Sequence, residues 1–226
     1  MSFDIARTPT LHAVATGDEQ QLVEDLQERV EAAMLQASEM PAVVEAAEAQ
    51  RRAEQHFLSL QKAERALNQF AKIAGEKLVA MREAALDAVI ESAAGADKLD
   101  FKGLSELASL ESRSRQATRA IERLVERLLP LALWTRLREE SHAAVTLARA
   151  LEGIAQERAE RVLDQLREAV GEEMILPVDL SKGVAGALLA RAEDLKRRGV
   201  HLSSNADSIE KTFEKTLGEM RHEFKV

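Results

Sequence analysis

PAVVEAAEAQRRAEQHFLSLQKAERALNQFAKIAGEKLVAMREAALDAVIESAA, residues 41–94, repeats mostly apolar side chains at alternating intervals of three and four positions. The alternation holds over about seven heptads, with Glu, Arg, Lys and Gln on the faces between, and predicts one long helix with coiled-coil-like packing. Such a helix, rising 1.5 Å per residue, is about 80 Å long, more than a compact domain of this size requires. We call its repeating positions the long seam: Val43, Ala46, Gln50, Ala53, Phe57, Leu60, Glu64, Leu67, Ala71, Ala74, Leu78, Met81, Ala85 and Ala88.

The composition agrees with an all-α fold. Ala, Glu, Lys, Leu and Arg make up more than half of the 226 residues, as in long helices and coiled coils. Six Phe, one Trp and no Tyr leave few bulky side chains, so helix contacts must be built from Ala and Leu. We therefore expect an elongated antiparallel long-helix bundle, or coiled-coil-like rod, with short C-terminal helices.

Several classes of function are disfavoured. The net charge of −8 argues against nucleic acid as a partner, because such binding depends on neutralising phosphates. The chain has no Cys, which excludes disulfides and thiolate chemistry. Neither G-x-x-x-x-G-K-[ST], G-x-G-x-x-G, G-x-S-x-G nor H-E-x-x-H occurs. We therefore expect no cofactor and no enzymatic activity.

Membrane insertion and secretion are not expected either. No segment has the roughly 18 or more uninterrupted apolar residues of a membrane span. The N-terminal sequence also lacks the basic start and apolar core of a secretory signal. A cytoplasmic location is the simplest expectation.

Breaks in the helical pattern divide the chain into three parts. Residues 1–17 have no helical period and are expected to form a flexible arm, 18–175 a long-helix rod, and 176–226 a C-terminal helical pair. A turn-rich stretch at 92–103 predicts a reversal of direction. The expected helices cover residues of about 18–39, 42–94, 103–129, 131–172, 182–198 and 205–224.

Two prolines interrupt these helices. Pro41 predicts a bend or short turn, because proline disfavours helical geometry in the residue before it. Pro130 should also break a helix, yet its neighbours are all apolar and include no residue suited to a tight hairpin. We favour one nearly continuous helix kinked at Pro130, and a buried hairpin is the alternative.

Two Glu-x-x-His pairs suggest a metal site as an alternative function. This spacing places both side chains on one helix face, as in ferritin-like di-metal carboxylate bundles. If the long helices fold back at 95–103, two further candidate ligands lie opposite the first pair. Paired or solvated surface side chains are the simpler interpretation. The candidates are Glu139 with His142, Glu219 with His222, and Glu54 with His56.

Two other groups of residues are candidate interaction sites. An arginine ladder at i, i+4 spacing needs acidic neighbours, which Glu122 and Glu126 supply locally and Glu24, Glu28 and Glu31 can supply by docking alongside. A solvated, internally paired face is favoured, and binding of phosphate or lipid headgroups is the alternative. The apolar run around the only Trp is either a dimer contact or a kink filled from within the core. These groups are Arg115, Arg119, Arg123 and Arg127, and Leu129, Leu131, Leu133 and Trp134.

Taken together, the patterns predict a non-enzymatic scaffold or adaptor that binds protein partners and itself, as a homodimer. The reason is that the long Ala/Leu helices carry more apolar face than one partner helix can cover. The alternatives are the di-metal protein and a bent helical dimer that binds a membrane surface, which the net charge of −8 disfavours.

Overall fold

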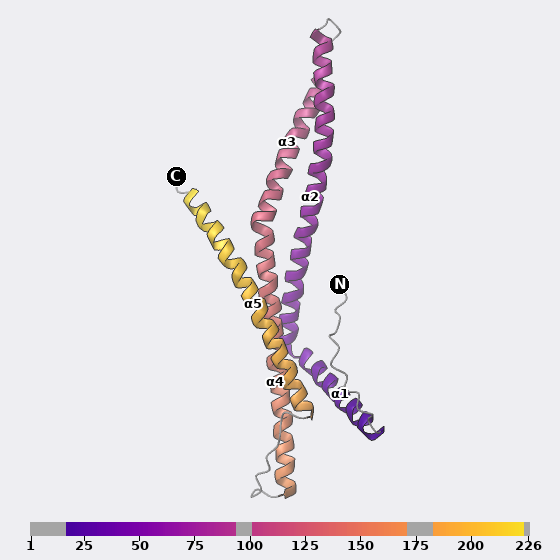
Figure 1. Cartoon of the computed structure of the whole chain (residues 1–226), viewed down its shortest axis with the longest axis vertical. Helices are drawn as coiled ribbons and strands as arrows, with labels where there is room; N and C mark the ends of the chain where they lie inside the picture. Colours follow the sequence, from indigo (N-terminus) through magenta and orange to yellow (C-terminus); the bar gives the residue numbers. More distant parts are fainter. Residues whose placement is uncertain (1–16, 94–100, 171–182, 224–226) are drawn as a thin grey trace. The chain divides into compact units, whose positions relative to one another are not determined.

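A computed structural model describes residues 17–93, 101–170 and 183–223, with side chains for 21–91, 103–169 and 183–214. These residues are helical except for a two-residue turn at 39–40, and they contain no strand. The all-α prediction is therefore confirmed. The elements are α1 (Gly17–Ser38), α2 (Pro41–Ala93), α3 (Phe101–Arg123), the π-helix η1 (Leu124–Leu128), α4 (Leu129–Val170) and α5 (Gly183–Glu223) (Figure 1).

The predicted break at Pro41 is present as a short turn. The N–H of Met40 donates to the carbonyl of Ala37 at 3.2 Å, which closes α1. The carbonyl of Met40 then accepts the N–H groups of Val43 and Val44 at 2.9 and 3.0 Å, which opens α2. Pro41 is the first residue of α2, a position where its missing N–H has no helical partner to lose.

The chain remains helical through Pro130, so the predicted continuity is confirmed and the hairpin alternative is wrong. The five residues of η1 form a π turn, in which the N–H of Leu129 donates to the carbonyl of Leu124, five residues back. In an α-helix the ring of a proline clashes with the carbonyl four residues earlier. The wider π turn lies over these residues and accommodates Pro130 without ending the helix.

The predicted pair of short C-terminal helices, 182–198 and 205–224, is wrong. α5 is one helix of 41 residues. The break predicted between these two helices begins at Gly199, but among the described glycines only Gly183 has a positive φ. Gly199 is instead buried, and its carbonyl accepts the Ser141 hydroxyl of α4 at 2.7 Å. Packing against α4 thus overrides the low helix propensity of glycine.

The chain divides into two compact units, which share the long helices. Among the described residues, unit 1 contains 17–44, 145–170 and 183–197, and unit 2 contains 45–93, 101–144 and 198–223. In unit 1, α1, α4 and α5 pack around a cluster in which Leu151 and Leu188 are fully buried. Alanines make up most of the remaining core and allow close helix contacts: Ala33, Ala37, Ala148, Ala155 and Ala192. Lys196 of α5 binds Glu152 of α4 at 2.5 Å.

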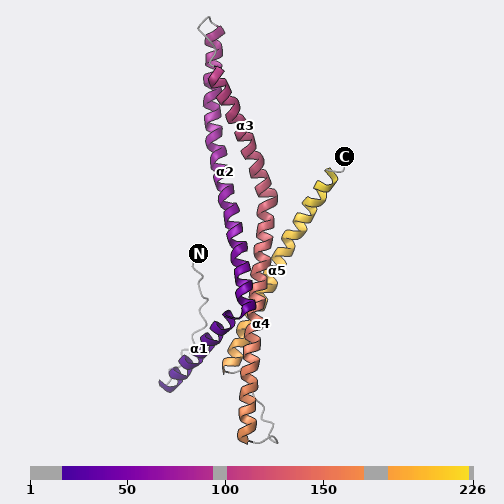
Figure 2. The same cartoon turned by 180° about the vertical axis from the view of Figure 1, so that it is seen from behind.

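In unit 2, α2 runs antiparallel to α3, η1 and the first part of α4. Arg82 of α2 binds Glu111 of α3 at 2.5 Å, and both views show α2 and α3 side by side (Figures 1 and 2). The reversal predicted for 92–103 is therefore confirmed in its direction, although 94–100 lie outside the described residues. Every long-seam position is buried or half-buried, including the polar Gln50 and Glu64. The heptad pattern thus identified the packed face of α2.

Candidate protein-interaction site

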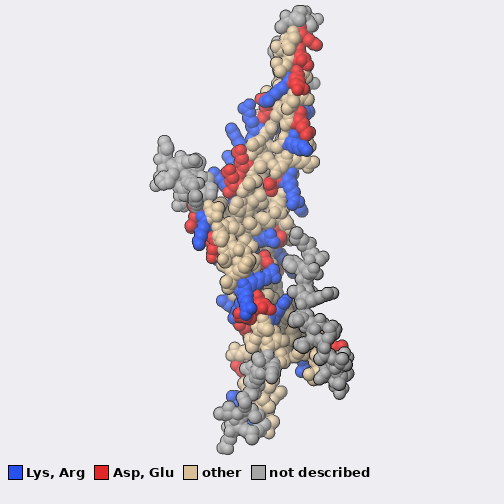
Figure 3. Space-filling view, viewed as in Figure 1, with Lys and Arg blue, Asp and Glu red and all other residues tan. Residues whose placement is uncertain are grey.

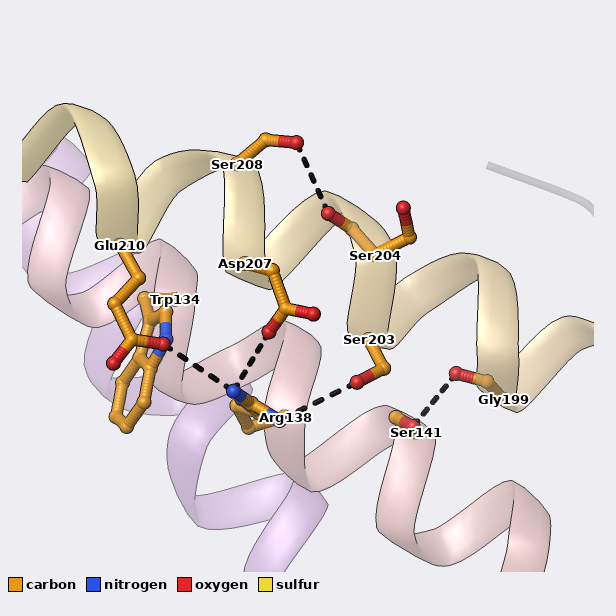
Figure 4. A network of polar contacts seen from close by, with 9 residues as sticks. All are labelled: Trp134, Arg138, Ser141, Gly199, Ser203, Ser204, Asp207, Ser208 and Glu210. Atoms are coloured by element: carbon orange, nitrogen blue, oxygen red, sulfur yellow. Dashed lines mark hydrogen bonds and ion pairs between the residues drawn. The ribbon is translucent and has the colours of Figure 1, made fainter.

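A polar network around Arg138 holds α4 against α5 in unit 2 (Figure 4). Arg138 Nη2 donates to Asp207 Oδ1 at 2.8 Å and to Glu210 Oε2 at 3.3 Å, and Nη1 donates to Ser203 Oγ at 3.3 Å. All three acceptors lie on one face of α5, at i, i+4 and i+7. One guanidinium therefore contacts two turns of the neighbouring helix, because its planar group carries several N–H donors in a fixed fork geometry.

The single Trp is part of this network. Trp134 Nε1 donates to Glu210 Oε2 at 3.3 Å, and its ring centroid lies 5.6 Å from the Arg138 guanidinium carbon. A second polar contact lies further along, where Arg198 binds Glu140 at 2.6 Å. These contacts hold α5 against α4, and Ile209 and Phe213 of α5 line the same hollows as Pro130 near the start of α4.

Arg136 connects α4 to α2. Its side chain forms an ion pair with Glu54, and its guanidinium carbon lies 5.3 Å from the centroid of the Phe57 ring. A cation over an aromatic face adds to the charge pair because both interactions are partly shielded from water. Arg136 and Arg138 point to different helices, so α4 is held on two sides.

Unit 2 also contains an apolar groove, which Phe57 helps to line. The groove has a volume of about 610 Å³, and its walls come from α2, η1, α4 and α5. A smaller hollow of about 270 Å³ shares Pro130, Ile209 and Phe213 with it and reaches Leu131 and Trp134. Figure 3 shows uncharged side chains gathered over the middle of the surface with charged ones around them. The groove is lined by Phe57, Gln61, Val125, Glu126, Leu129, Pro130, Leu133, Ser208, Ile209, Thr212 and Phe213.

The four residues of the predicted apolar contact, which are those around Trp134, do not share one environment. Leu129 and Leu133 line the groove and face side chains of α2 and α5, as expected for a kink filled from within the chain. Trp134 is half-buried and bound to α5. Leu131 remains 46 % exposed and is the member best placed for contact with another molecule.

The arginine ladder is exposed along α3 and η1. Arg115 lies 3.5 Å from Glu111, which also binds Arg82. The hydrogen bond from Arg82, followed by the charge of Arg82, lowers the pKa of the Glu111 carboxyl below its ordinary value. Arg119, Arg123 and Arg127 are exposed. Docking of the acidic stripe of α1 on this ladder stays a prediction.

The structure does not assemble the candidate metal ligands that it describes. The sequence predicted that His142 lies opposite Glu54. In the structure Glu54 pairs instead with Arg136, which is six residues before His142. That register prediction is wrong because side-chain packing, and not a symmetric turn, sets the alignment of α2 with α4. His56 and His142 are exposed and Glu139 is half-buried. The side chains of Glu219 and His222 lie outside the described residues.

No group of three or more His, Asp or Glu residues suited to a metal ion occurs among the described side chains. The residues that do meet, Arg136, Arg138, Asp207 and Glu210, were not identified from the sequence. Each is one of many charged residues in a helix-rich chain, and no motif distinguishes those that bind another helix. The only available signal was the proximity of two arginines to the single Trp.

No helix in the described ranges is both long and apolar enough to cross a membrane. No protein-family model matches the chain, and comparisons with curated proteins and with solved structures likewise give no match.

Proposed function

We propose that this protein is a non-enzymatic helical scaffold that acts through protein–protein contacts and forms a homodimer. The observation that carries the proposal is the amount of apolar surface left on unit 2 after its own helices have packed. Phe70, Ile73, Leu86 and Ile90 of α2 are 40, 55, 61 and 64 % exposed. Full burial of a large apolar side chain contributes about 1.5–3 kcal/mol, so covering the half that is still exposed contributes about 1 kcal/mol each, and a contact that covers several of them is favoured.

The polar contacts of unit 2 support a structural role. Arg136 and Arg138 bind carboxylates of neighbouring helices and an aromatic ring each, which is how helices are held in place. A catalytic nucleophile needs a base within hydrogen-bond reach and a third group that orients it. The networks around these two arginines are instead cation–carboxylate pairs. A cytoplasmic location, which agrees with the absence of Cys, belongs to the same proposal.

The test is the mass of the full chain in solution, measured by size-exclusion chromatography with light scattering over a wide range of concentrations. We expect a mass of two chains that falls to one chain on dilution. A mass of one chain at every concentration would contradict self-association.

A further inference from the structure

α2 carries a second row of heptad-spaced positions. Each member of this row comes one residue before a member of the long seam. The eight members of the row alternate at intervals of four and three residues, and every one of them is exposed. The long seam is covered by helices of the same chain, whereas this outer row has no cover among the described residues. The outer row consists of Ser59, Ala63, Ala66, Phe70, Ile73, Lys77, Ala80 and Ala84.

The outer row has its large apolar side chains at the centre and small ones toward both ends. Phe70 and Ile73 are adjacent members of the row, and Ser or Ala fill every other place except that of Lys77. Small side chains allow two helices to approach closely, and a lysine can extend its charged end past an apolar contact into water. The pattern is that of a helix–helix interface and not of a solvated face.

The row is also complementary to itself. If a second α2 lies antiparallel across a two-fold axis between Phe70 and Ile73, Phe70 meets Ile73 of the second copy. With the same axis, the outer members pair Ala66 with Lys77, Ala63 with Ala80, and Ser59 with Ala84. Each pair occurs twice, as a two-fold interface requires. No bulky residue meets another bulky residue except at the centre.

The charges beside the row favour this direction. Lys62, Gln69, Glu76 and Glu83 flank the outer row on the side away from the long seam, at heptad spacing, and all four are exposed. In the antiparallel pair, Lys62 lies opposite Glu83 of the second copy, and Gln69 lies opposite Glu76. A parallel pair in register would instead place Lys62 on Lys62 and Glu83 on Glu83, which is unfavourable.

We infer that the outer row of α2 is the homodimer interface, with the α2 helices of two copies antiparallel about Phe70 and Ile73. This inference rests on the proposed self-association and names its surface.

The first test of this interface compares Phe70→Glu with Leu131→Glu, which adds the same charge to the exposed apolar surface of α4. We expect Phe70→Glu to weaken dimerisation at least about tenfold, because the added charge enters the contact twice, and Leu131→Glu to leave it unchanged. Circular dichroism checks that both variants remain helical.

Charge reversal tests the direction of the helices. Lys62→Glu and Glu83→Lys should each weaken the dimer about fivefold, because like charges then meet in both symmetric pairs. The double variant restores opposite charges and should return to within about twofold of the native dissociation constant. Two single effects that merely add in the double variant would overturn the antiparallel arrangement.

Engineered cysteines give a second, independent test in this Cys-free chain. The double variant Ala63→Cys with Ala80→Cys should form a crosslinked dimer on oxidation, whereas Ala63→Cys alone should not. In the antiparallel pair, two copies of residue 63 lie about 25 Å apart along the helix axes. A crosslink with Ala63→Cys alone would contradict the inference.

The outcomes separate the two proposals. A native chain that is monomeric at every concentration overturns both. A native dimer that persists in Phe70→Glu and is lost in Leu131→Glu keeps the proposed self-association but assigns it to the α4 surface, which overturns the outer row as the interface.

Discussion

Arg138 shows how one side chain can determine the position of a helix. Its guanidinium reaches Ser203, Asp207 and Glu210 on α5 and lies over Trp134 on its own helix. Its side chain is 40 % exposed, so water screens part of the charge interaction. The strength of the site comes from several bonds made by one planar group and not from a single ion pair.

We expect Arg138→Ala to lower the free energy of unfolding by about 1–3 kcal/mol, because it removes the bonds to α5 together with packing on Trp134. The matched control is Arg52→Ala, since Arg52 is exposed and pairs with Glu48, at 3.7 Å on the same helix. That change should cost less than about 0.5 kcal/mol. Urea unfolding followed by circular dichroism measures both, and equal losses would contradict the role of Arg138.

At the scale of single elements, α2 and α5 show that a glycine can lie inside a helix or at its end. Gly75 lies inside α2, Gly199 lies in the middle of α5, and Gly183 opens α5 with a φ of 74°. Only Gly183 uses a conformation that other residues avoid. The predicted helices included Gly75 and Gly183 and left Gly199 in a break between 182–198 and 205–224, and the placement of Gly199 was wrong because α5 is continuous there.

Gly75 and Gly183 therefore predict opposite effects of the same substitution. A Cβ added at Gly75 meets nothing within 4 Å, so Gly75→Ala should stabilise the protein by about 0.5–1 kcal/mol through higher helix propensity. Gly183→Ala has equal space but must adopt a positive φ, and we expect it to destabilise by about 1 kcal/mol or more. Thermal unfolding distinguishes the two. A loss of stability in Gly75→Ala would show that this helix interior is strained.

At the scale of the whole molecule, the chain contains two packed clusters connected by helices that continue from one unit into the other. Unit 1 is centred on Leu151 and Leu188, and unit 2 on the covered long seam, which includes Phe57 and Leu78. Because each unit has its own buried side chains, a cavity made in one should first reduce the stability of that unit.

Leu188→Ala and Leu78→Ala make this comparison with the same substitution. Each should cost about 2–5 kcal/mol, with Leu188 at the upper end because it is fully buried. Amide hydrogen exchange should accelerate first in residues 145–170 and 183–197 for Leu188→Ala, and in α3 and the facing part of α2 for Leu78→Ala. Acceleration of the same amides in both variants would mean that the two units open as one.

Local periodicity was enough to predict the helices before residue 171, the packed face of α2 and the turn at Pro41. Each depends on the period of about 3.6 residues or on the missing N–H of proline, which are properties of neighbouring residues. The same reasoning favoured continuity through Pro130, although the π turn that permits it was not predictable. In the candidate site, the sequence identified the apolar residues around Trp134. It did not identify the charged residues beside them, Arg136, Arg138, Asp207 and Glu210.

Only the tertiary structure decided which residues from different helices meet. Arg136 and not His142 lies opposite Glu54, Arg138 is shared by three side chains of α5, and Gly199 remains helical because it packs against Ser141. A helix can slide by a turn and present a similar row of Ala, Leu, Glu and Arg, so the sequence pattern leaves its register open. The register is selected by the combined fit of side chains that are distant in the sequence.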